Sequence, residues 1–475
     1  MTFSSAVILT DLNDYILPSQ ACVKPVEPVR IDESAVVLKD AEGYYQVTND
    51  GVSNRLEKAK ITIDDCLACS GCVTSAESVL VSMQSREELY KVLEQNAQGP
   101  DQKLVIVSIA PQCLASFAAK YSTSAVDAFW RIHDFLTGLG VHHVVDISTA
   151  KKIALLESGR IFVERYQQQK LPLLASSCPG WICYAEKTHP GILEYIDSTK
   201  SPQQIMGSMV KNYWAAQDGL TPDSVYHVTI MPCYDKKLEA SRKDFYSEIY
   251  HTRDVDCVIT TGEVERMLDD RGVDFNTFNC NTTNCNQLRD VIHADEFKDG
   301  SSSGGYLSFI MRYAAQQIFG VTLSANDIAM GRNGVEVVPG RNSDISQVNY
   351  TPPGASSPAL SFLYAYGFRN IQNIVRKVKS KKSSSRKIGR IDLVEVMACP
   401  SGCTNGGGQL KDTDLASVEA KYFADLTNLK SLSGCPDLDN LYCEWLASPE
   451  KIKLNLHTQY HSIENTLENP LTVKW

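Results

Sequence analysis

The apolar residues of the chain form short continuous runs that alternate with amphipathic segments. Such runs are typical of strands that are covered by helices on both faces. They predict strands at residues 104–111, 144–147, 172–178, 225–233 and 391–396. Segments with helical periodicity predict helices at residues 87–94, 125–139, 307–319 and about 412–429. This alternation of strands and helices predicts an α/β fold.

Breaks in this pattern divide the chain into three regions. Residues 12–28 contain three prolines and little periodicity, so we expect extended coil there. We predict an N-terminal region at 1–98, a large domain at 99–445 and a polar C-terminal tail at 446–475. Within the large domain, residues 376–390 carry eight basic residues among serines, which predicts an exposed linker. A nuclear-localisation signal or a site for an acidic partner is the alternative interpretation of this basic linker.

Composition narrows the possible classes of function. The net charge of −10 over 475 residues argues against general nucleic-acid binding, and no apolar run is long enough to span a membrane. The first residues lack the basic start of a secretory signal or transit peptide, so we expect a cytoplasmic location. Fifteen cysteines in a reducing compartment are better explained by metal ligation than by disulfides.

Four cysteines follow the ends of predicted strands. Cys399 and Cys403 lie in a glycine-rich segment after the strand at 391–396, and Cys178 and Cys233 follow two other strands. Strand ends can converge at one sheet edge or between two lobes, where the four thiols would supply the ligands of one iron–sulfur cubane. Buried cysteines beside a flexible loop are the structural alternative for the glycine-rich segment.

A second group of cysteines lies in the N-terminal region. Cys66, Cys69 and Cys72 have the Cys-x-x-Cys-x-x-Cys spacing that wraps three thiolates around an iron–sulfur cluster, and a zinc site is the alternative. No cysteine followed by proline continues the run, so the fourth ligand must be remote. We assign it to Cys22, with Cys113 as the alternative.

The residues after Cys233 include two lysines and an acid, Lys236, Lys237 and Glu239. A cation here would offset the negative charge of a thiolate-ligated cluster or donate a hydrogen bond to a ligand. A solvated helix start is the alternative. The remaining cysteines have no spacing typical of a metal site, and we interpret most of them as small buried hydrophobic residues. They are Cys113, Cys183, Cys257, Cys280, Cys285, Cys435 and Cys443.

Three segments resemble, in the same order, the signature segments of iron-only hydrogenases. They are Ser-Ser-Cys178-Pro-Gly-Trp, Met-Pro-Cys233-Tyr-Asp-Lys-Lys-Leu-Glu and Glu395-Val-Met-Ala-Cys-Pro-Ser-Gly-Cys403-Thr-Asn-Gly-Gly-Gly-Gln. The resemblance spans about residues 103–443 and implies a two-lobed α/β domain with mixed sheets flanked by helices. In that family four cysteines hold a cubane, and the last also bridges to a di-iron subsite with carbonyl and cyanide ligands. The corresponding positions here are Cys178, Cys233, Cys399 and Cys403.

The same resemblance implies roles for two further residues. The chain also departs from the hydrogenase pattern at two places. Lys236 corresponds to a lysine that contacts the di-iron ligands, and Met397 to a methionine that flanks them. Hydrogenases carry a cysteine proton donor where this chain has Ser177, and a serine hydroxyl titrates far above neutral pH. The glycine-rich segment near 301–305 also differs from the hydrogenase pattern. Proton delivery is therefore expected to be compromised.

The N-terminal stretch around Cys22, followed by Cys66, Cys69 and Cys72, is similar to a non-hydrogenase branch. This branch is the cytosolic iron–sulfur assembly factor family, also described as nuclear prelamin A recognition factor-like. The resemblance implies two [4Fe–4S] clusters, one on Cys22, Cys66, Cys69 and Cys72 and one on the hydrogenase-type quartet. The N-terminal part is thus expected to be a small ferredoxin-like cluster-binding region.

The branch also implies partners and location. It places the protein between a P-loop scaffold complex that builds clusters and a targeting complex, including a WD40 protein, that inserts them into client enzymes. Cytoplasm and also nucleus are the implied locations, and neither nucleic acid nor membrane is an expected partner. Family members often end in an aromatic residue after an acidic one; Trp475 fits this pattern as a contact for the targeting complex, and Lys474 does not.

The leading hypothesis is an assembly and transfer factor without substrate turnover of its own. A true hydrogenase is the second hypothesis, disfavoured by Ser177 and by the lack of further ferredoxin-type motifs. A stable electron-transfer or structural iron–sulfur protein is the third.

Overall fold

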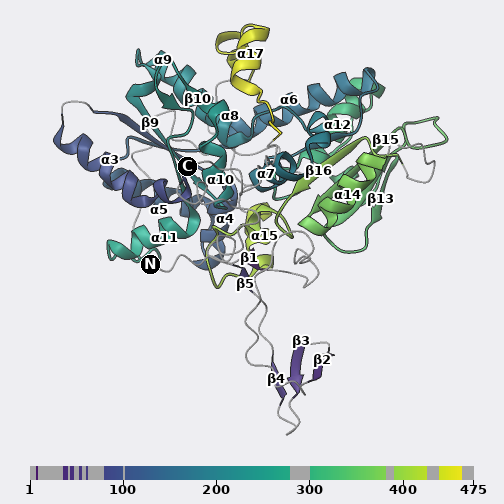
Figure 1. Cartoon of the computed structure of the whole chain (residues 1–475), viewed down its shortest axis with the longest axis horizontal. Coiled ribbons are helices and arrows are strands. Elements are labelled where there is room, and N and C mark those ends of the chain that lie inside the picture. Colours follow the sequence, from purple (N-terminus) through teal and green to yellow (C-terminus); the bar gives the residue numbers. More distant parts are fainter. Residues whose placement is uncertain are drawn as a thin grey trace, which may run out of the picture.

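The computed structural model describes residues 80–99, 102–278, 300–380, 390–424 and 438–462, together with the backbone of short strands before residue 62. In the N-terminal region these strands form two small antiparallel sheets. One pairs β1 (Val7–Ile8) with β5 (Lys60–Ile61), and the other has the order β2 (Val36–Asp40), β3 (Gly43–Val47) and β4 (Ser53–Arg55). The rest of the described chain forms two α/β lobes (Figure 1).

The first lobe is built on a parallel sheet. Its strand order is β12 (Cys257–Thr260), β9 (Val225–Met231), β6 (Leu104–Ile109) and β7 (His143–Asp146). All seven residues of β9 are buried, as expected for a central strand that is covered on both faces. The strands predicted at 104–111, 144–147 and 225–233 are therefore confirmed, with slightly different ends.

Helices pack on this sheet and complete the first hydrophobic core. The main ones are α3 (Arg86–Gln98), α4 (Pro111–Lys120), α5 (Ala125–Gly138), α8 (Pro202–Met209) and α11 (Thr261–Asp270). Helix α4 is missing from the sequence-based prediction, which ends a strand at Pro111. Proline instead occupies the first helical position, where its fixed φ angle suits a helix and its missing N–H costs nothing.

The second lobe is built on a mixed sheet. Its order is β13 (Val335–Pro339), β14 (Ile345–Tyr350), β15 (Leu360–Tyr366), β16 (Leu393–Met397) and β8 (Leu173–Ala175). The last three strands are parallel, whereas the first three are antiparallel. The sequence analysis predicts only β8 and β16. It misses β14, whose buried face includes the polar Ser346, β13, four of whose five residues are exposed, and β15.

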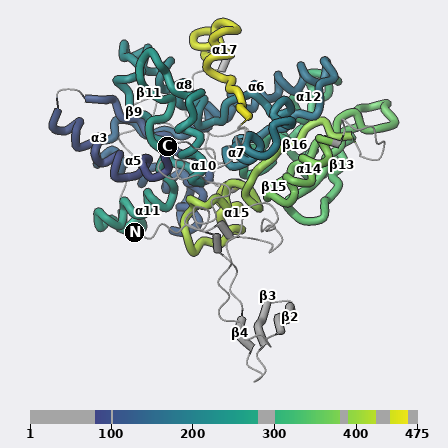
Figure 2. Tube along the Cα trace, viewed as in Figure 1, coloured from purple at the N-terminus to yellow at the C-terminus, as the bar shows by residue number. Residues whose placement is uncertain are grey.

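Four helices pack on this sheet and contribute to the second core. They are α6 (Ser148–Gln167), α7 (Pro179–Thr188), α12 (Tyr306–Phe319) and α14 (Phe368–Ser380). Helix α6 joins the two lobes, because Ile153 packs in the first core and Phe162 packs in the second. Figure 2 shows this helix between α8 of the first lobe and α12 of the second, and it contacts both.

Shorter elements complete the described chain. They are β10 (Tyr246–Ser247), β11 (Thr252–Arg253), the π-helical turn at Val210–Trp214, and the helices α9 (Ala215–Gln217), α10 (Asp235–Ala240), α13 (Ala325–Met330), α15 (Leu415–Ala424), α16 (Leu438–Glu444) and α17 (Pro449–Leu456). The helix predicted at about 412–429 thus begins at Leu415. None of the described helices is long and apolar enough to cross a membrane.

Two segments differ from the sequence-based expectation. The basic linker predicted at 376–390 is wrong in its first part, because residues 376–380 are the last turn of α14 and Val378 is buried. Part of the predicted polar tail is helix α17, whose Leu456 is fully buried in the first core. The backbone N–H of Lys200 donates to the carbonyl oxygen of Leu456 at 2.7 Å. Both segments are amphipathic over stretches too short for their periodicity to stand out among many charged residues.

A buried ion pair fixes the start of α10 to α11. The ammonium of Lys237 lies 2.8 Å from Glu263 and donates to the carbonyl oxygen of Gln84 at 2.6 Å. Glu263 also accepts from the N–H of Thr260, closing the capping box of α11. The side chains of both charged residues are at most 5% exposed, so the alternative of a solvated helix start is wrong for Lys237.

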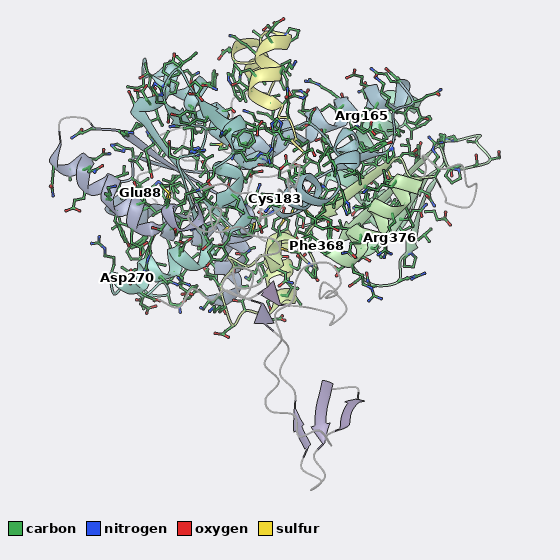
Figure 3. All side chains as sticks on the ribbon, in the orientation of Figure 1. Glu88, Arg165, Cys183, Asp270, Phe368 and Arg376 are labelled. Atoms are coloured by element: carbon green, nitrogen blue, oxygen red, sulfur yellow. The ribbon has the colours of Figure 1, made fainter. Side chains whose placement is uncertain are left out.

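We expect Glu263→Gln to lower the free energy of unfolding by about 3 kcal/mol, because the ammonium of Lys237 stays buried without its counter-charge. Urea unfolding followed by circular dichroism measures the loss. Glu88→Gln in α3 (Figure 3) is the control, because the ion pair of Glu88 with Lys91 is 3.5 Å long and both side chains are partly exposed, so its loss should cost about 0.5 kcal/mol or less. Equal losses in the two variants would contradict the role of the buried pair.

Candidate metal centre

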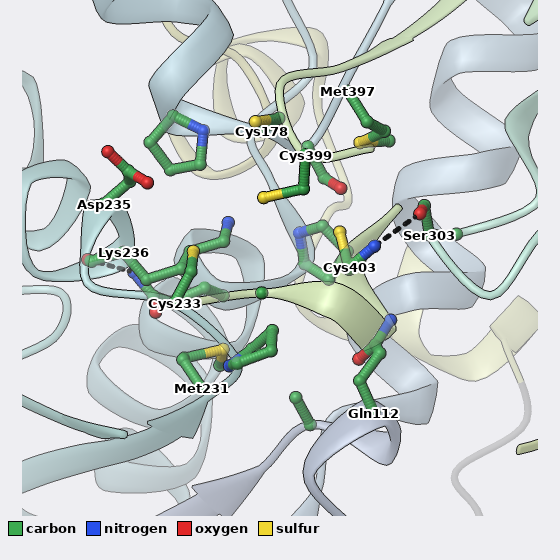
Figure 4. Close-up of a pocket in the computed structure, with 18 of the residues that line it drawn as sticks. Gln112, Cys178, Met231, Cys233, Asp235, Lys236, Ser303, Met397, Cys399 and Cys403 are labelled. Carbon is green, nitrogen blue, oxygen red and sulfur yellow. Dashed lines mark hydrogen bonds between the residues drawn. The ribbon is translucent and has the colours of Figure 1, made fainter. Parts of the chain in front are cut away.

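Four thiols meet between the two lobes. Cys178, Cys233, Cys399 and Cys403 all line one cavity of about 60 Å³ (Figure 4). The structure thus brings together the four cysteines that the sequence analysis assigns to one cluster. Their role as ligands stays a prediction.

Parallel pairing in the second lobe places two of the cysteine segments side by side. β8 and β16 are neighbours, so the chain after each strand leaves the sheet at the same edge. Cys178 follows β8 and immediately precedes α7, while Cys399 follows β16. The backbone N–H of Ala398 donates to Cys178 Sγ at 3.3 Å, a contact that links the two segments directly.

The first lobe supplies the remaining cysteine from the end of its central strand. Cys233 lies two residues after β9, and the glycine-rich segment after Cys403 packs against this strand end. The N–H of Gly408 donates to the carbonyl oxygen of Pro232 at 2.8 Å. A Cβ atom on Gly406 would collide with that same oxygen. The glycines are therefore required for the close approach of the two lobes at the cavity.

Burial makes the four thiols poor acids. It raises the pKa of Cys178 to about 12, with further contributions from Cys403 and Asp235. Burial also raises the pKa values of Cys233 and Cys399 well above the ordinary range. The pKa of Cys403 is raised by burial, although Ser303 and Lys236 act in the opposite direction. Four thiolates in this cavity therefore need a positively charged group among them, which iron ions would provide.

The donor set fits a cluster better than a single ion. Among the residues that the structure describes, no three His, Cys, Asp or Glu side chains form a group that could hold one metal ion. A cubane instead takes one thiolate at each of four iron corners, which suits four thiols around a cavity. The N–H of Ala398, which donates to Cys178 Sγ, is the type of contact that stabilises a ligating sulfur.

Polar and apolar groups complete the wall of the cavity. Lys236 is buried and forms an ion pair with Glu239 at 2.9 Å, so the solvated alternative is wrong for this lysine too. Met397 is fully buried and also lines the cavity. Ser303 accepts from the N–H of Cys403 at 2.8 Å.

Some residues in this wall were missed by the sequence analysis. Lys151 and Gln112 line the cavity, yet in the sequence neither lies in a motif that is typical of a metal site. Ser303 lies in the segment that differs from the hydrogenase pattern, and this departure was the one available signal. Gly304 and Gly305 of the same segment have positive φ angles and lead directly into α12, so the helix predicted at 307–319 begins at Tyr306.

Ser177 lies between the four-cysteine cavity and a smaller cavity of about 30 Å³. The smaller cavity is also lined by Cys183, Glu239 and Arg242. Cys183 is central in the molecule, as Figure 3 shows.

The N-terminal cluster residues Cys22, Cys66, Cys69 and Cys72 lie outside the described residues, as does Trp475. The alternative fourth ligand, Cys113, is buried in α4, and its Sγ donates to the carbonyl oxygen of Ile230 at 3.5 Å. Burial raises the pKa of Cys113 to about 12. Cys257 is likewise buried, whereas Cys183 is half-buried and Cys443 is exposed.

Comparison with known proteins places this geometry in a family. Residues 103–407 match the family model described as iron only hydrogenase large subunit, C-terminal domain. The apo [FeFe]-hydrogenase HydA1 from Chlamydomonas reinhardtii, in a variant form, is similar in structure with a TM-score of 0.64 and 26% sequence identity. This similarity covers 79% of the present chain and 98% of the hydrogenase chain.

The relatives that match this chain over its full length are named as iron–sulfur assembly proteins and not as hydrogenases. Cytosolic iron-sulfur assembly component 3 of Rattus norvegicus is 45% identical, over 100% of this chain and 99% of the relative. The cytosolic Fe-S cluster assembly factor narfl of Xenopus tropicalis has the same identity and coverage. A probable factor of this name from Dictyostelium discoideum is 39% identical over the same shares. The chain therefore belongs to the cytosolic iron–sulfur assembly component 3 family, and residues 103–407 form its iron-only-hydrogenase-like domain.

Proposed function

We propose that this protein is a component of the cytosolic iron–sulfur assembly machinery. In this proposal it binds two [4Fe–4S] clusters and mediates between the scaffold complex and the targeting complex in the maturation of cytosolic and nuclear iron–sulfur proteins. The observation that carries the proposal is the four-cysteine cavity, in a chain that matches cytosolic assembly components over its full length.

The first part of the proposal concerns the cluster between the lobes. Cys178, Cys233, Cys399 and Cys403 would hold it, each through one thiolate. When bound, a cubane supplies one-electron chemistry and a group that can be passed on intact. The chain contributes burial that limits access of water, and the N–H of Ala398 that donates to a ligating sulfur. Because the ligands come from both lobes, the cluster would also hold the lobes together.

The second cluster is assigned to Cys22, Cys66, Cys69 and Cys72 from their spacing. Three ligands within seven residues can wrap one cluster locally. The remote ligand, Cys22, would return from a proline-rich segment. This cluster therefore depends less on the packing of the two lobes.

Absence of hydrogenase activity is part of the proposal and is supported by Ser177. This residue lines the cavity where a proton donor to a bound group is needed. A serine hydroxyl holds its proton far above neutral pH, so it is a poor relay. The relatives matching the full chain are named as assembly factors rather than hydrogenases.

The proposal also includes a cellular location and partners for the protein. The relatives are named cytosolic, which supports a cytosolic location, and we propose the nucleus as an additional one. We propose a P-loop scaffold complex as the source of clusters and a targeting complex with a WD40 protein as their recipient. Trp475 is the proposed contact with the recipient, because tryptophan is enriched among residues that dominate binding energy.

Iron analysis tests the cluster assignment. Anaerobically purified protein is expected to hold about eight iron and eight sulfide ions, as two cubanes require. Cys22→Ala should lose about four of each while the main domain stays folded. Chemical quantification with electron paramagnetic resonance measures both quantities. Unchanged iron in Cys22→Ala would contradict its assignment and point to another ligand, such as Cys113.

Cluster transfer separates assembly from the other two functions. Loaded protein is expected to restore the activity of an apo-client enzyme in the presence of the targeting complex, under anaerobic conditions. A stable electron-transfer protein would keep its clusters and leave the client inactive. Infrared bands of carbonyl and cyanide, together with hydrogen evolution, would instead indicate a hydrogenase.

The two clusters should differ in their effect on stability. We expect Cys403→Ala to lower the thermal unfolding midpoint by about 5 °C more than Cys66→Ala does, because only the first variant removes a link between the lobes. Differential scanning calorimetry of the anaerobically loaded proteins measures the difference. Equal shifts in the two variants would refute this asymmetry.

Removal of Trp475 tests the proposed contact with the targeting complex. We expect at least about tenfold weaker binding, equal to about 1.4 kcal/mol, with iron content and binding of the scaffold complex unchanged. Calorimetric titration measures the affinity, and Lys474→Ala serves as the control that keeps the tryptophan. Equal affinity with and without Trp475 would contradict the proposed contact with the targeting complex. Reduced thermal stability would indicate instead that the tryptophan packs on its own domain.

A further inference from the structure

The hydroxyl group of Ser303 lies beside Cys403 in the wall of the four-cysteine cavity. Ser303 is 1% exposed, and its Oγ atom accepts a hydrogen bond from the N–H of Cys403 at 2.8 Å (Figure 4). We propose that the Ser303 hydroxyl donates its hydrogen to Cys403 Sγ in the loaded protein and thereby raises the reduction potential of the cluster in this cavity. The inference rests on the proposed function, because it requires a cluster bound to Cys403.

The Ser303 oxygen lies directly on the backbone that leads to Cys403. A Cβ atom at Gly402 would collide with Ser303 Oγ, so this close approach requires a glycine. Gly402 also has a φ angle of +85°, a conformation that favours glycine. The hydroxyl therefore has a fixed place beside the backbone of the predicted ligand.

The hydrogen of this hydroxyl is available to the sulfur of the same cysteine. A hydroxyl group can accept and donate at the same time, and the N–H of Cys403 uses only an acceptor position of Ser303 Oγ. The hydroxyl also hydrogen-bonds to the thiol of Cys403 and lowers its pKa, and after burial this contact has the largest effect on that pKa. A contact that lowers the pKa of a thiol stabilises the thiolate, which is the form that binds metal.

The neighbours of both residues are bound to one carboxylate. The hydroxyl of Ser302 donates to Glu419 of α15 at 2.5 Å, and the hydroxyl of Thr404 donates to the same carboxylate oxygen. Ser302 precedes Ser303 in the chain, and Thr404 follows Cys403. Glu419 therefore holds the two segments together and keeps the serine beside the cysteine.

A second serine makes the same backbone contact but directs its hydrogen elsewhere. Ser176 Oγ accepts from the N–H of Cys178 at 3.0 Å and donates to the carbonyl oxygen of Val396 at 2.5 Å. The hydrogen of Ser176 is thus bound to a backbone oxygen, whereas Ser303 hydrogen-bonds to a thiol. The two serines differ in the one feature on which the proposal depends.

A hydrogen bond to a ligating sulfur acts on the oxidation state of a cluster. A cubane with four thiolates carries a net negative charge that grows by one on reduction. A donor at the sulfur stabilises the more negative, reduced form more than the oxidised form, so it raises the reduction potential. Replacing Ser303 leaves in place the charged groups that act on Cys403, which are Lys236, Glu395 and Glu419. A change in potential would therefore report the hydrogen bond.

The experiment uses the full-length chain carrying Cys66→Ala, so that the cluster between the lobes supplies the signal. In this background, Ser303→Ala is expected to raise the ratio of oxidised to reduced cluster about tenfold at a fixed potential, equal to a shift of about 59 mV to more negative values. Potentiometric titration followed by electron paramagnetic resonance measures the potential. Iron content and the thermal midpoint of the same samples report on any structural damage.

Resonance Raman spectroscopy gives a second readout that a merely structural role would not change. A hydrogen bond to the ligating sulfur weakens the donation of its electrons to iron, so the iron–sulfur stretching bands should move to higher frequency in Ser303→Ala. The parent protein should also show a shift of these bands between H₂O and D₂O, and Ser303→Ala should reduce that shift.

Three further variants isolate the hydroxyl hydrogen. Ser176→Ala is the matched control, because it also removes the acceptor of a ligand's N–H but no donor to a sulfur. Its ratio of oxidised to reduced cluster should stay within about twofold of the parent protein. Ser303→Thr keeps the hydroxyl, whereas Ser303→Val has the same shape without it. The ratio should therefore be about tenfold higher in Ser303→Val than in Ser303→Thr.

Two results would overturn the role of Ser303. One is an unchanged potential in fully loaded Ser303→Ala, and the other is an equal shift in Ser176→Ala, which would indicate the loss of any acceptor beside a ligand. If Ser303→Ala does not load, the comparison of Ser303→Thr with Ser303→Val takes its place, and equal potentials in these two variants have the same meaning. Failure of the proposed function is a separate outcome, because the parent protein itself would then hold no iron between the lobes.

Discussion

The convergence of four thiols at the junction of two lobes is the constraint on which the rest of the structure depends. Each thiol alone is a neutral, poorly acidic group, since burial raises the pKa values of all four cysteines. Together they line a cavity in which four deprotonated thiolates are stable only beside positively charged metal ions. The fold thus places four cysteines around a cavity, and a bound metal cluster would balance their charge.

Close contact between backbones makes this convergence possible. Gly406 and Gly408 let the segment after Cys403 lie directly on the end of β9, where any side chain would collide with Pro232 or Thr260. The other cysteine-bearing strands, β8 and β16, are neighbours in one sheet. One lobe therefore supplies three thiols from a common edge, and the other supplies the fourth across a junction without intervening side chains. This arrangement explains why the cluster would act as a structural link as well as a cofactor.

The hydrogenase-like architecture has been kept while the groups around the cavity differ from those of a proton-reducing site. Ser177 stands between the two cavities with a hydroxyl that holds its proton tightly. Lys236 is balanced by Glu239, which lies 2.9 Å from its ammonium group. These features fit the proposed role of a cluster that is held in place more than one that must exchange protons rapidly. They are also consistent with the names of the full-length relatives.

The sequence by itself determined the elements that have a strong local pattern. The apolar runs that became β6, β9 and β16 were evident because strands buried on both faces have few polar residues. The cysteines that follow β9 and β16 were equally evident, since their spacing to proline or glycine is local. Helix α4 was missed because the apolar run before it ends at a proline, and Pro111 is also the first residue of the helix. The strand β14 and helix α17 were missed because a polar residue, Ser346, lies on the buried face of β14 and only the last two residues of α17 are buried.

Only the tertiary structure decided which side chains complete the cavity. Lys151 and Tyr422 are separated by 271 residues, and in the sequence each is an ordinary member of a helical segment. Lys237 was open to interpretation as a solvated residue, yet it is buried because Glu263 and the carbonyl oxygen of Gln84 come from distant elements. The burial of a charge depends on what packs around it, and that information lies in long-range contacts rather than in local spacing.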